Sequence, residues 1–149
     1  MKRRESRELA FTLLFEWTFR EDETLDEIIG LAEKCRETQV DDFARTLAAK
    51  TIERYIALDH VIQTHSDKWK LNRLSRVTLT VLRMSVCELS AMDDIPAGAT
   101  INEAVELMKK YATEDEAAYV NGVLGAFYRS REDAGPEPSA QAELRPGEV

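Results

Sequence analysis

The first residues of the chain carry side chains that can bind phosphate groups. Within the first seven positions, four basic side chains face one acidic side chain, Glu5. The basic residues are Lys2, Arg3, Arg4 and Arg7. Guanidinium and ammonium groups form charge-assisted hydrogen bonds with phosphate oxygens. This segment is therefore a candidate phosphate-binding site.

Three phenylalanines follow at intervals of four residues, Phe11, Phe15 and Phe19. On a helix this spacing places the three rings along one face. In one interpretation the rings pack between two helical layers, while the neighbouring arginines are solvated. In the other, the basic and aromatic side chains bind single-stranded RNA together, with phosphates on the cations and bases stacked on the rings. The residue pattern leaves both interpretations open, although Phe11 is assigned to the core in either case.

Sequence signatures of enzymes and metal sites are missing. The chain has no glycine-rich phosphate loop, no CxxC, no HExxH and no Gly-x-Ser-x-Gly. His60 and His65 are five residues apart, so on one helix they diverge by about 140° and cannot hold a metal through that helix alone. Cys35 and Cys87 are expected to be single thiols and not a redox pair. We therefore expect no catalytic residues, no metal and no cofactor.

Arg83 lies within the most hydrophobic segment of the chain. A buried guanidinium without a partner is very unfavourable, so Arg83 requires a carboxylate or backbone acceptors. We expect a structural ion pair with Glu88 or Glu103.

The body of the chain is predicted to be all-α, because apolar residues recur with a period of 3.6 and chain breakers are few. Thr24 with Glu27, Thr100 with Glu103 and Thr113 with Glu116 have the spacing of capping boxes. Helices are expected at residues 5–20, 24–35, 41–65, 75–89, 100–112 and 113–131. The fourth carries apolar residues on all sides, which is typical of a central helix.

The charge and composition of the chain indicate how it is organised. The 149 residues have a net charge of −8, which argues against nucleic-acid binding through bulk positive charge but allows a local patch. Residues 132–149 contain five acidic side chains against one arginine, together with three prolines, and are expected to form a disordered acidic tail after a domain of residues 1–131. No apolar run approaches the roughly 20 residues that span a bilayer. Two cysteines indicate a reducing cytoplasm.

Five separated segments together resemble one family, the transcription antitermination factor NusB. They are RRESRELAFTLLFEW at 3–17, W-x-L-x-R-L at 69–74, V-L-R-M-S-V-C-E-L at 81–89, I-P-x-x-x-x-I-N-E-A-V-E-L at 95–107 and Y-V-N-G-V-L at 119–124. No single segment is specific, but their order and spacing make the resemblance strong.

The resemblance implies a fold of about six to seven helices in two packed helical bundles, and a role as a small bacterial RNA-binding adaptor. Such proteins join NusE, a small ribosomal subunit protein, on the boxA element of nascent RNA. The resulting complex with RNA polymerase suppresses termination, notably in ribosomal RNA operons.

The resemblance also implies which residues make contacts. The arginine-rich start maps to Arg3, Arg4 and Arg7, with Lys2 nearby. Tyr119 occupies the aromatic position of the family's (F/Y)-V-N-G segment, and Asp115, one helical turn earlier, is expected near the RNA. For NusE, the implied contact positions are Phe15 and Thr78, where Thr78 replaces a residue that is often acidic in the family.

Two alternative functions come from other classes. The same helical module occurs as the RNA-binding part of certain ribosomal RNA cytosine methyltransferases, but here the acidic tail stands where a catalytic domain would begin. The other alternative is a protein-binding or self-associating module, in which the phenylalanines form a homodimer interface.

Overall fold

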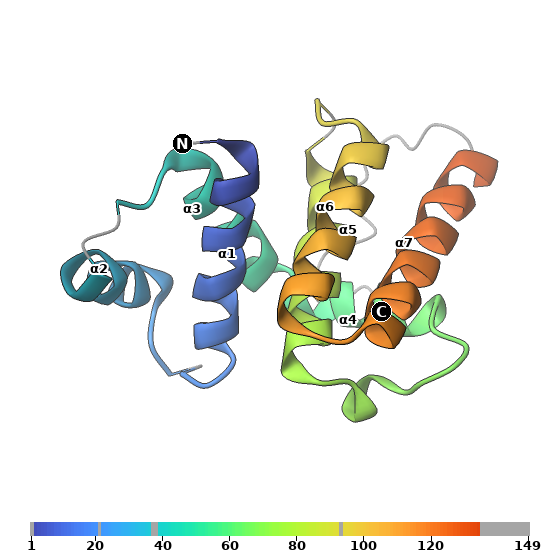
Figure 1. The fold of residues 1–149 in the computed structure, drawn as a ribbon, viewed down its shortest axis with the longest axis horizontal. Coiled ribbons are helices and arrows are strands. Elements are labelled where there is room, and N and C mark those ends of the chain that lie inside the picture. The colour runs from blue at the N-terminus through green and yellow to red at the C-terminus, as the bar shows by residue number, and fades with distance from the viewer. Residues whose placement is uncertain (1, 21, 37–38, 93, 135–149) are drawn as a thin grey trace. The chain divides into compact units, whose positions relative to one another are not determined.

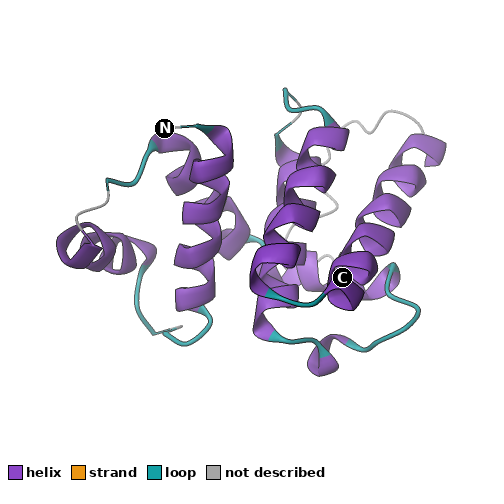
Figure 2. Ribbon diagram, viewed as in Figure 1, coloured by secondary structure: helices purple, strands orange, loops and turns teal. Residues whose placement is uncertain are grey.

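The computed structural model describes residues 2–20, 22–36, 39–92 and 94–134, and within these ranges the chain forms only helices and loops (Figure 2). The helices are α1 (Arg3–Trp17), α2 (Leu25–Arg36), α3 (Asp42–Glu53), α4 (Tyr55–Thr64), the short 3-10 helix η1 (Leu71–Arg73), α5 (Arg76–Ala91), α6 (Ala97–Tyr111) and α7 (Glu114–Ala134). The all-α prediction is confirmed.

The chain divides into two compact units, Met1–Glu53 and Arg54–Val149. Helices α1 to α3 belong to the first unit and α4 to α7 to the second (Figure 1). The expected pair of helical bundles is therefore confirmed. Each unit is described separately below.

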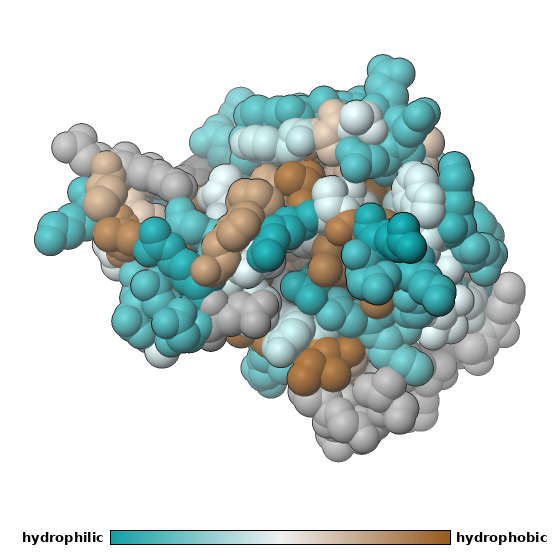
Figure 3. All heavy atoms as spheres, turned by 90° about the horizontal axis from the view of Figure 1, so that it is seen from below, coloured by the Kyte–Doolittle hydropathy of each residue, from teal (hydrophilic) through white to brown (hydrophobic). Residues whose placement is uncertain are grey.

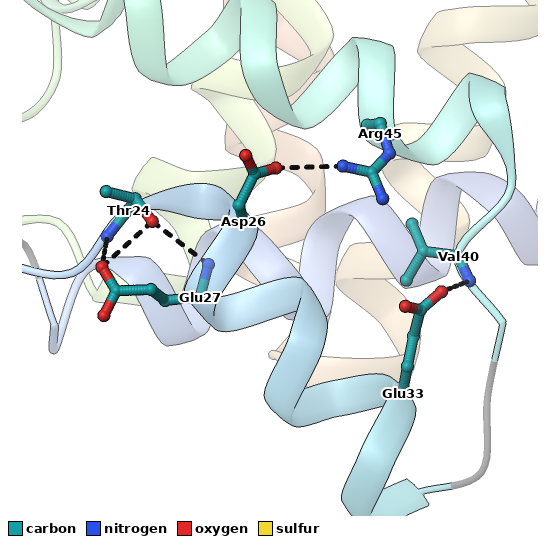
Figure 4. Close-up of polar contacts among 6 residues, drawn as sticks. All are labelled: Thr24, Asp26, Glu27, Glu33, Val40 and Arg45. Carbon is teal, nitrogen blue, oxygen red and sulfur yellow. Dashed lines mark hydrogen bonds and ion pairs between the residues drawn. The ribbon is translucent and has the colours of Figure 1, made fainter.

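In the first unit, α1 packs against both α2 and α3. The apolar stripe of α1 is buried together with Ile28 and Ile29 of α2 and Leu47 of α3. The stripe consists of Ala10, Leu13, Leu14 and Trp17. Polar contacts also join these helices. The Ser6 hydroxyl of α1 donates a hydrogen bond of 2.7 Å to Asp41, which directly precedes α3. In Figure 4, Arg45 of α3 pairs with Asp26 of α2, and Glu33 accepts a hydrogen bond from the backbone N–H of Val40.

The capping box predicted at Thr24 and Glu27 is present at the start of α2 (Figure 4). The Glu27 carboxylate accepts the Thr24 backbone N–H at 3.1 Å, and the Thr24 hydroxyl accepts the Glu27 N–H at 3.1 Å. These hydrogen bonds, led by the one from the Thr24 backbone, lower the pKa of Glu27 from its usual 4.5. The box at Thr113 and Glu116 is likewise confirmed at the start of α7.

The helix predicted at residues 41–65 is two helices. Helix α3 ends at Glu53 and α4 begins at Tyr55, because Arg54 leaves the helical conformation with φ −114° and ψ 12°. Neither proline nor glycine occurs there, so no local sequence signal marks the break. The break coincides with the boundary between the two units.

In the second unit, α5 is the central helix and packs against α4, α6 and α7. Its buried residues include Val81, Leu82, Met84, Val86 and Cys87, which lie around the whole helix circumference. The prediction of a central helix at this position is confirmed.

The capping box predicted at Thr100 and Glu103 is wrong. Helix α6 begins at Ala97 with Pro96 as its N-cap, so Thr100 is the fourth helical residue. Proline fixes φ near the helical value, which allows the helix to start earlier. The buried Thr100 hydroxyl instead donates a hydrogen bond to Glu88 of α5.

Helix α7 continues to Ala134, three residues beyond its expected end. The first residues of the predicted acidic tail at 132–149 are therefore helical, while residues 135–149 lie outside the described part of the chain.

Candidate nucleic-acid interface

The guanidinium of Arg3 lies over the ring of Phe43, with 4.0 Å between its central carbon and the ring centroid. Arg3 is in the first turn of α1 and is exposed, whereas Phe43 comes from α3 and is half-buried. A cation over an aromatic face is attracted by the ring quadrupole. The ring therefore covers one face of the guanidinium, while Arg3 as a whole stays exposed.

Lys2 and Arg4 are also exposed beside Arg3. Helix α1 has no side-chain cap at its N-terminus, and Glu5 is the only acidic residue of its first turn. The N-terminus of a helix carries a partial positive charge and unsatisfied N–H groups, so cations there are unfavourable for helix stability, whereas a bound anion is favourable. This cationic start suits anion binding better than it suits helix stability.

Arg7 is not exposed, contrary to the expectation that it lies at the surface with Arg3 and Arg4. Only 5% of its surface is accessible, and its guanidinium lies 5.7 Å from the centroid of the same Phe43 ring. One helical turn separates Arg7 from Arg3, so both point towards α3 but Arg7 lies deeper. Direct phosphate contact by Arg7 is thus not available in this structure.

Phe43 was missed as a candidate site residue by the sequence analysis. In the sequence it is an aromatic residue within the predicted helix 41–65, where an apolar side chain favours core packing. The interaction with Arg3 arises from packing between α1 and α3, which the local sequence does not encode.

Tyr119 of α7 is nearly buried, with 9% of its surface accessible. Its hydroxyl lies 2.5 Å from the Ser66 hydroxyl, which donates to the backbone carbonyl of Trp69. Because the serine proton is used there, Tyr119 is the donor to Ser66. The ring centroids of Tyr119 and Trp69 are 4.7 Å apart. The aromatic position implied to contact RNA therefore packs against another aromatic ring.

Trp69 is half-buried, and the ammonium of the exposed residue Lys68 lies 4.9 Å from its ring centroid. Trp69 was quoted only as part of the W-x-L-x-R-L segment and was not a candidate site residue. The available signal was an aromatic residue between the helices predicted at 41–65 and 75–89.

Asp115 is exposed in the first turn of α7, one turn before Tyr119. An acidic side chain in the first turn stabilises a helix through its dipole. Asp115 and Tyr119 belong to the second unit, whereas Lys2, Arg3 and Arg4 belong to the first.

The phenylalanine ladder of α1 runs from the core to the surface. Phe11 is buried as expected, Phe15 is half-buried and Phe19 is 59% exposed. The Phe15 ring stacks on Phe11 at 5.9 Å and meets Phe19 edge-on at 5.2 Å. The last two rings form an accessible aromatic surface.

Few large hydrophobic side chains are exposed in the described residues. They are Phe19, Leu31, Ile56, Tyr111 and Tyr128. On the face drawn in Figure 3, hydrophilic side chains predominate and hydrophobic ones form separate patches. Phe19 has the largest exposed fraction among the five, which makes the end of α1 the strongest candidate for an apolar protein contact.

Thr78 does not provide the expected partner-facing side chain, since only 1% of its surface is accessible. It lies in the first turn of α5, where its backbone N–H and its hydroxyl bond to the N-cap residue Ser75 at 3.2 and 3.0 Å. This is ordinary N-capping geometry. In this structure Thr78 thus bonds within the N-terminus of α5, and its contact with NusE stays a prediction.

The carboxylate partner of Arg83 is Asp59 of α4, and the expectation of Glu88 or Glu103 is wrong. The pair is bidentate, with N–O distances of 2.7 and 2.8 Å. Glu88 is five residues from Arg83 on the same helix and points to a different side, where it accepts the Thr100 hydrogen bond. The ion pair joins α4 to α5 and has a structural role.

Within the described residues, no group of three or more His, Cys, Asp and Glu side chains is placed to hold a metal ion. None of the helices in that part of the chain is both long and apolar enough to span a membrane.

Residues 4–129 match the NusB family. The chain belongs to the NusB family. It is 40% identical over 134 residues to the transcription antitermination protein NusB of Clostridium novyi, an alignment that covers 87% of this chain and all of that protein. It is 38% identical to the NusB protein of Ruminiclostridium cellulolyticum, covering 94% and 96% of the two chains.

Solved NusB structures are similar in fold. The structure of T. maritima NusB superposes with a TM-score of 0.77 at 37% identity, covering 88% of this chain and 93% of the other. A crystal structure of the antitermination factors NusB and NusE in complex with double-stranded RNA contains a chain with a TM-score of 0.76 at 29% identity, covering 88% and 100%. These comparisons confirm the predicted membership of the NusB family.

Proposed function

We propose that this chain is an RNA-binding transcription antitermination factor. It binds boxA-type single-stranded RNA in nascent transcripts, notably of ribosomal RNA operons, together with NusE. In the antitermination complex with RNA polymerase it suppresses termination. The role is one of binding and not of catalysis, and it belongs to the cytoplasm. Membership of the NusB family supports this proposal, as does similarity to a chain crystallised with NusE and RNA.

The observation that carries the proposal is the exposed cationic first turn of α1, with the Arg3 guanidinium held over Phe43. A chain with a net charge of −8 concentrates three exposed cations where the helix N-terminus already favours an anion. Each phosphate neutralised on a single strand changes the slope of log affinity against log salt by about −0.7. Three contacts predict a slope of about −2 and a modest affinity that NusE on the same RNA would raise.

A double variant, Arg3→Ala with Arg4→Ala, tests this assignment. Binding to a labelled boxA-like RNA is followed by fluorescence anisotropy at several salt concentrations, with and without NusE. We expect weaker binding and a slope smaller by about 1.4, since two phosphate contacts are lost.

The matched control is Lys34→Ala with Arg129→Ala, which removes the same charge from exposed positions on α2 and α7. We expect this control to retain most of the affinity and the full salt slope. Equal losses of RNA affinity in the two double variants would show that net charge alone matters and would reject the start of α1 as the RNA site.

For NusE, the proposed contact is the aromatic surface of Phe15 and Phe19. The alternative occupant of this surface is a second copy of the chain. Light scattering of the protein alone, and then with NusE, separates the two: a dimer that NusE does not dissociate would favour self-association.

We assign the RNA-binding function to residues 1–131. None of the proposed contacts falls in the acidic segment 132–149.

A further inference from the structure

A groove of about 590 Å³ lies in the second unit between α6 and α7, which pack side by side (Figure 1). Its α6 wall runs from Gly98 to Lys109, and its α7 wall runs from Glu114 to Asn121. At 1.5 Å of rise per residue, the α6 wall is about 16 Å long. This length matches about five residues of an extended chain.

The groove lies on a different side of α7 from the aromatic residues Tyr119 and Trp69, whose rings pack together. Asn121 lines the groove and comes two residues after Tyr119, so it projects about 200° further around the helix. None of the candidate RNA-binding residues is part of the lining. The groove is therefore a separate surface from the one to which RNA contact is assigned.

The deepest part of the groove is apolar, and α7 contributes only small side chains to it. Ala117 is buried, and Ile101 and Val105 of the opposite wall are half-buried. Ala118 is exposed at the side of the groove. Because alanine leaves space that a larger side chain would fill, the groove can accept apolar side chains of moderate size from a partner.

Each wall carries one exposed asparagine, Asn102 on α6 and Asn121 on α7. Neither side chain makes a hydrogen bond within the described part of the chain. An asparagine amide can both donate and accept hydrogen bonds. A helical segment satisfies its backbone groups internally, whereas an extended segment presents N–H and C=O groups on both sides and its side chains alternately above and below. An extended segment along the groove could therefore bond to both walls while every second side chain enters the apolar part.

The charges along the groove favour a basic segment. The Lys109 ammonium lies 3.9 Å from a carboxylate oxygen of Glu106, so its charge is partly compensated by its own helix. Glu114 is exposed on the α7 wall and has no ion-pair partner among the described residues. The chain as a whole has a net charge of −8, which attracts cationic partners. An arginine or lysine of the segment would pair with Glu114.

We propose that the groove between α6 and α7 binds an extended, basic segment of a partner protein. Its backbone bonds to Asn102 and Asn121, and its alternate side chains are apolar. This inference goes beyond the proposed RNA-binding function, because it adds a protein-docking surface in the second unit. The aromatic surface of Phe15 and Phe19 belongs to the first unit.

The probe is a fluorescein-labelled, capped heptapeptide in which arginine and valine alternate, titrated with the full chain by fluorescence anisotropy. We expect saturable binding that weakens as the salt concentration rises. The same peptide with glutamate in place of arginine should bind far more weakly.

The variant Ala118→Phe tests the place of binding, because its ring fills the groove from an exposed position. It should lower the affinity for the arginine–valine peptide by about tenfold or more. The matched control is Ala49→Phe, which changes an exposed alanine of α3 in the first unit and should leave the affinity unchanged. Thermal melting checks that both variants are folded.

The polar contacts are tested one at a time. Asn102→Ala and Asn121→Ala should each weaken peptide binding by about three- to tenfold, whereas Asn72→Ala, at an exposed position of η1, should not. Glu114→Gln should reduce the salt dependence of binding. Its control is Glu132→Gln, which removes an exposed carboxylate of α7 outside the groove and should leave the salt dependence unchanged.

Four results would overturn the inference. The first is the absence of saturable peptide binding at low salt, and the second is an equal loss of peptide affinity in Ala118→Phe and Ala49→Phe. The third is a folded Ala118→Phe variant that no longer binds boxA-like RNA with NusE, which would make the groove part of the RNA site. The fourth is a dimer of the parent that Ala118→Phe dissociates in light scattering, which would assign the groove to a second copy of the chain. Failure of the parent to bind RNA would instead overturn the proposed function alone, because the peptide titration contains no RNA.

Discussion

The ion pair between Arg83 and Asp59 allows a quantitative test of what holds the second unit together. The side chains are 11% and 26% exposed, and both guanidinium–carboxylate hydrogen bonds are short. The Tyr55 ring adds a cation–π contact at 5.3 Å. We predict that Arg83→Ala destabilises the protein and that the loss is coupled to Asp59.

The loss of stability expected for Arg83→Ala lies between two limits. Breaking one partner of a fully buried pair costs about 3 to 5 kcal/mol, whereas an exposed pair contributes about 0.2 to 1 kcal/mol. Because both side chains retain some solvent contact, we expect Arg83→Ala to cost about 2 kcal/mol. Arg83→Met keeps the packing of the aliphatic stem and should cost about 1 kcal/mol.

A double-mutant cycle of Arg83→Ala and Asp59→Ala, measured by urea denaturation, gives the coupling energy directly. The matched control is the pair between Arg45 and Asp26, whose side chains are 45% and 89% exposed. We expect a coupling above about 1 kcal/mol for the first pair and below about 0.5 kcal/mol for the second. If the stability losses of Arg83→Ala and Asp59→Ala simply added in the double variant, the argument that this ion pair stabilises the unit would be refuted.

Three further predictions concern the first unit. Phe15→Ala should cost about 1 to 2 kcal/mol of stability and lower the affinity for NusE more than tenfold. Phe11→Ala should cost about 3 to 5 kcal/mol of stability, while its folded fraction binds NusE as tightly as the parent. A larger stability loss for Phe15→Ala than for Phe11→Ala would place Phe15 in the core. The hydrogen bonds to Thr24 lower the pKa of Glu27 from its usual 4.5. The capping box therefore stabilises α2 fully at pH values above 4.5, and this stabilisation is lost as the pH falls through the lowered pKa of Glu27. In an NMR titration, Thr24→Ala should raise this pKa only part of the way, because the backbone N–H at position 24 remains; no change would contradict the assignment. Arg7→Ala should lower the melting temperature, because the side chain is buried, and a parental melting temperature would show that burial of Arg7 contributes nothing.

Local signals in the sequence predicted local structure well. Thr24 and Thr113 each have a glutamate three residues later, and both capping boxes are present because their hydrogen bonds involve only one helical turn. Thr100 has the same pattern but lies inside α6, since Pro96 starts that helix earlier. Whether a threonine followed three residues later by a glutamate forms a capping box thus depends on the residues that precede it.

Contacts between helices were not predictable from periodicity. The sequence indicated that Arg83 needs a carboxylate, but its choice of Asp59 depends on how α4 packs on α5. The burial of Arg7 and the placement of Arg3 on Phe43 depend in the same way on the packing of α1 against α3. Each of these partners is at least 24 residues away in the sequence, where spacing rules carry no information.

The contact between Arg3 and Phe43 has a consequence for the thermodynamics of RNA binding. A free arginine side chain loses up to about 2 kcal/mol of conformational entropy when a ligand immobilises it. Arg3 is already restricted by the ring of Phe43, so part of that loss occurs on folding and not on binding. In the proposed RNA complex, the RNA affinity of Arg3 therefore depends partly on Phe43 of α3. We predict that Phe43→Leu weakens RNA binding chiefly through a less favourable binding entropy, a change that calorimetry measures separately from the enthalpy.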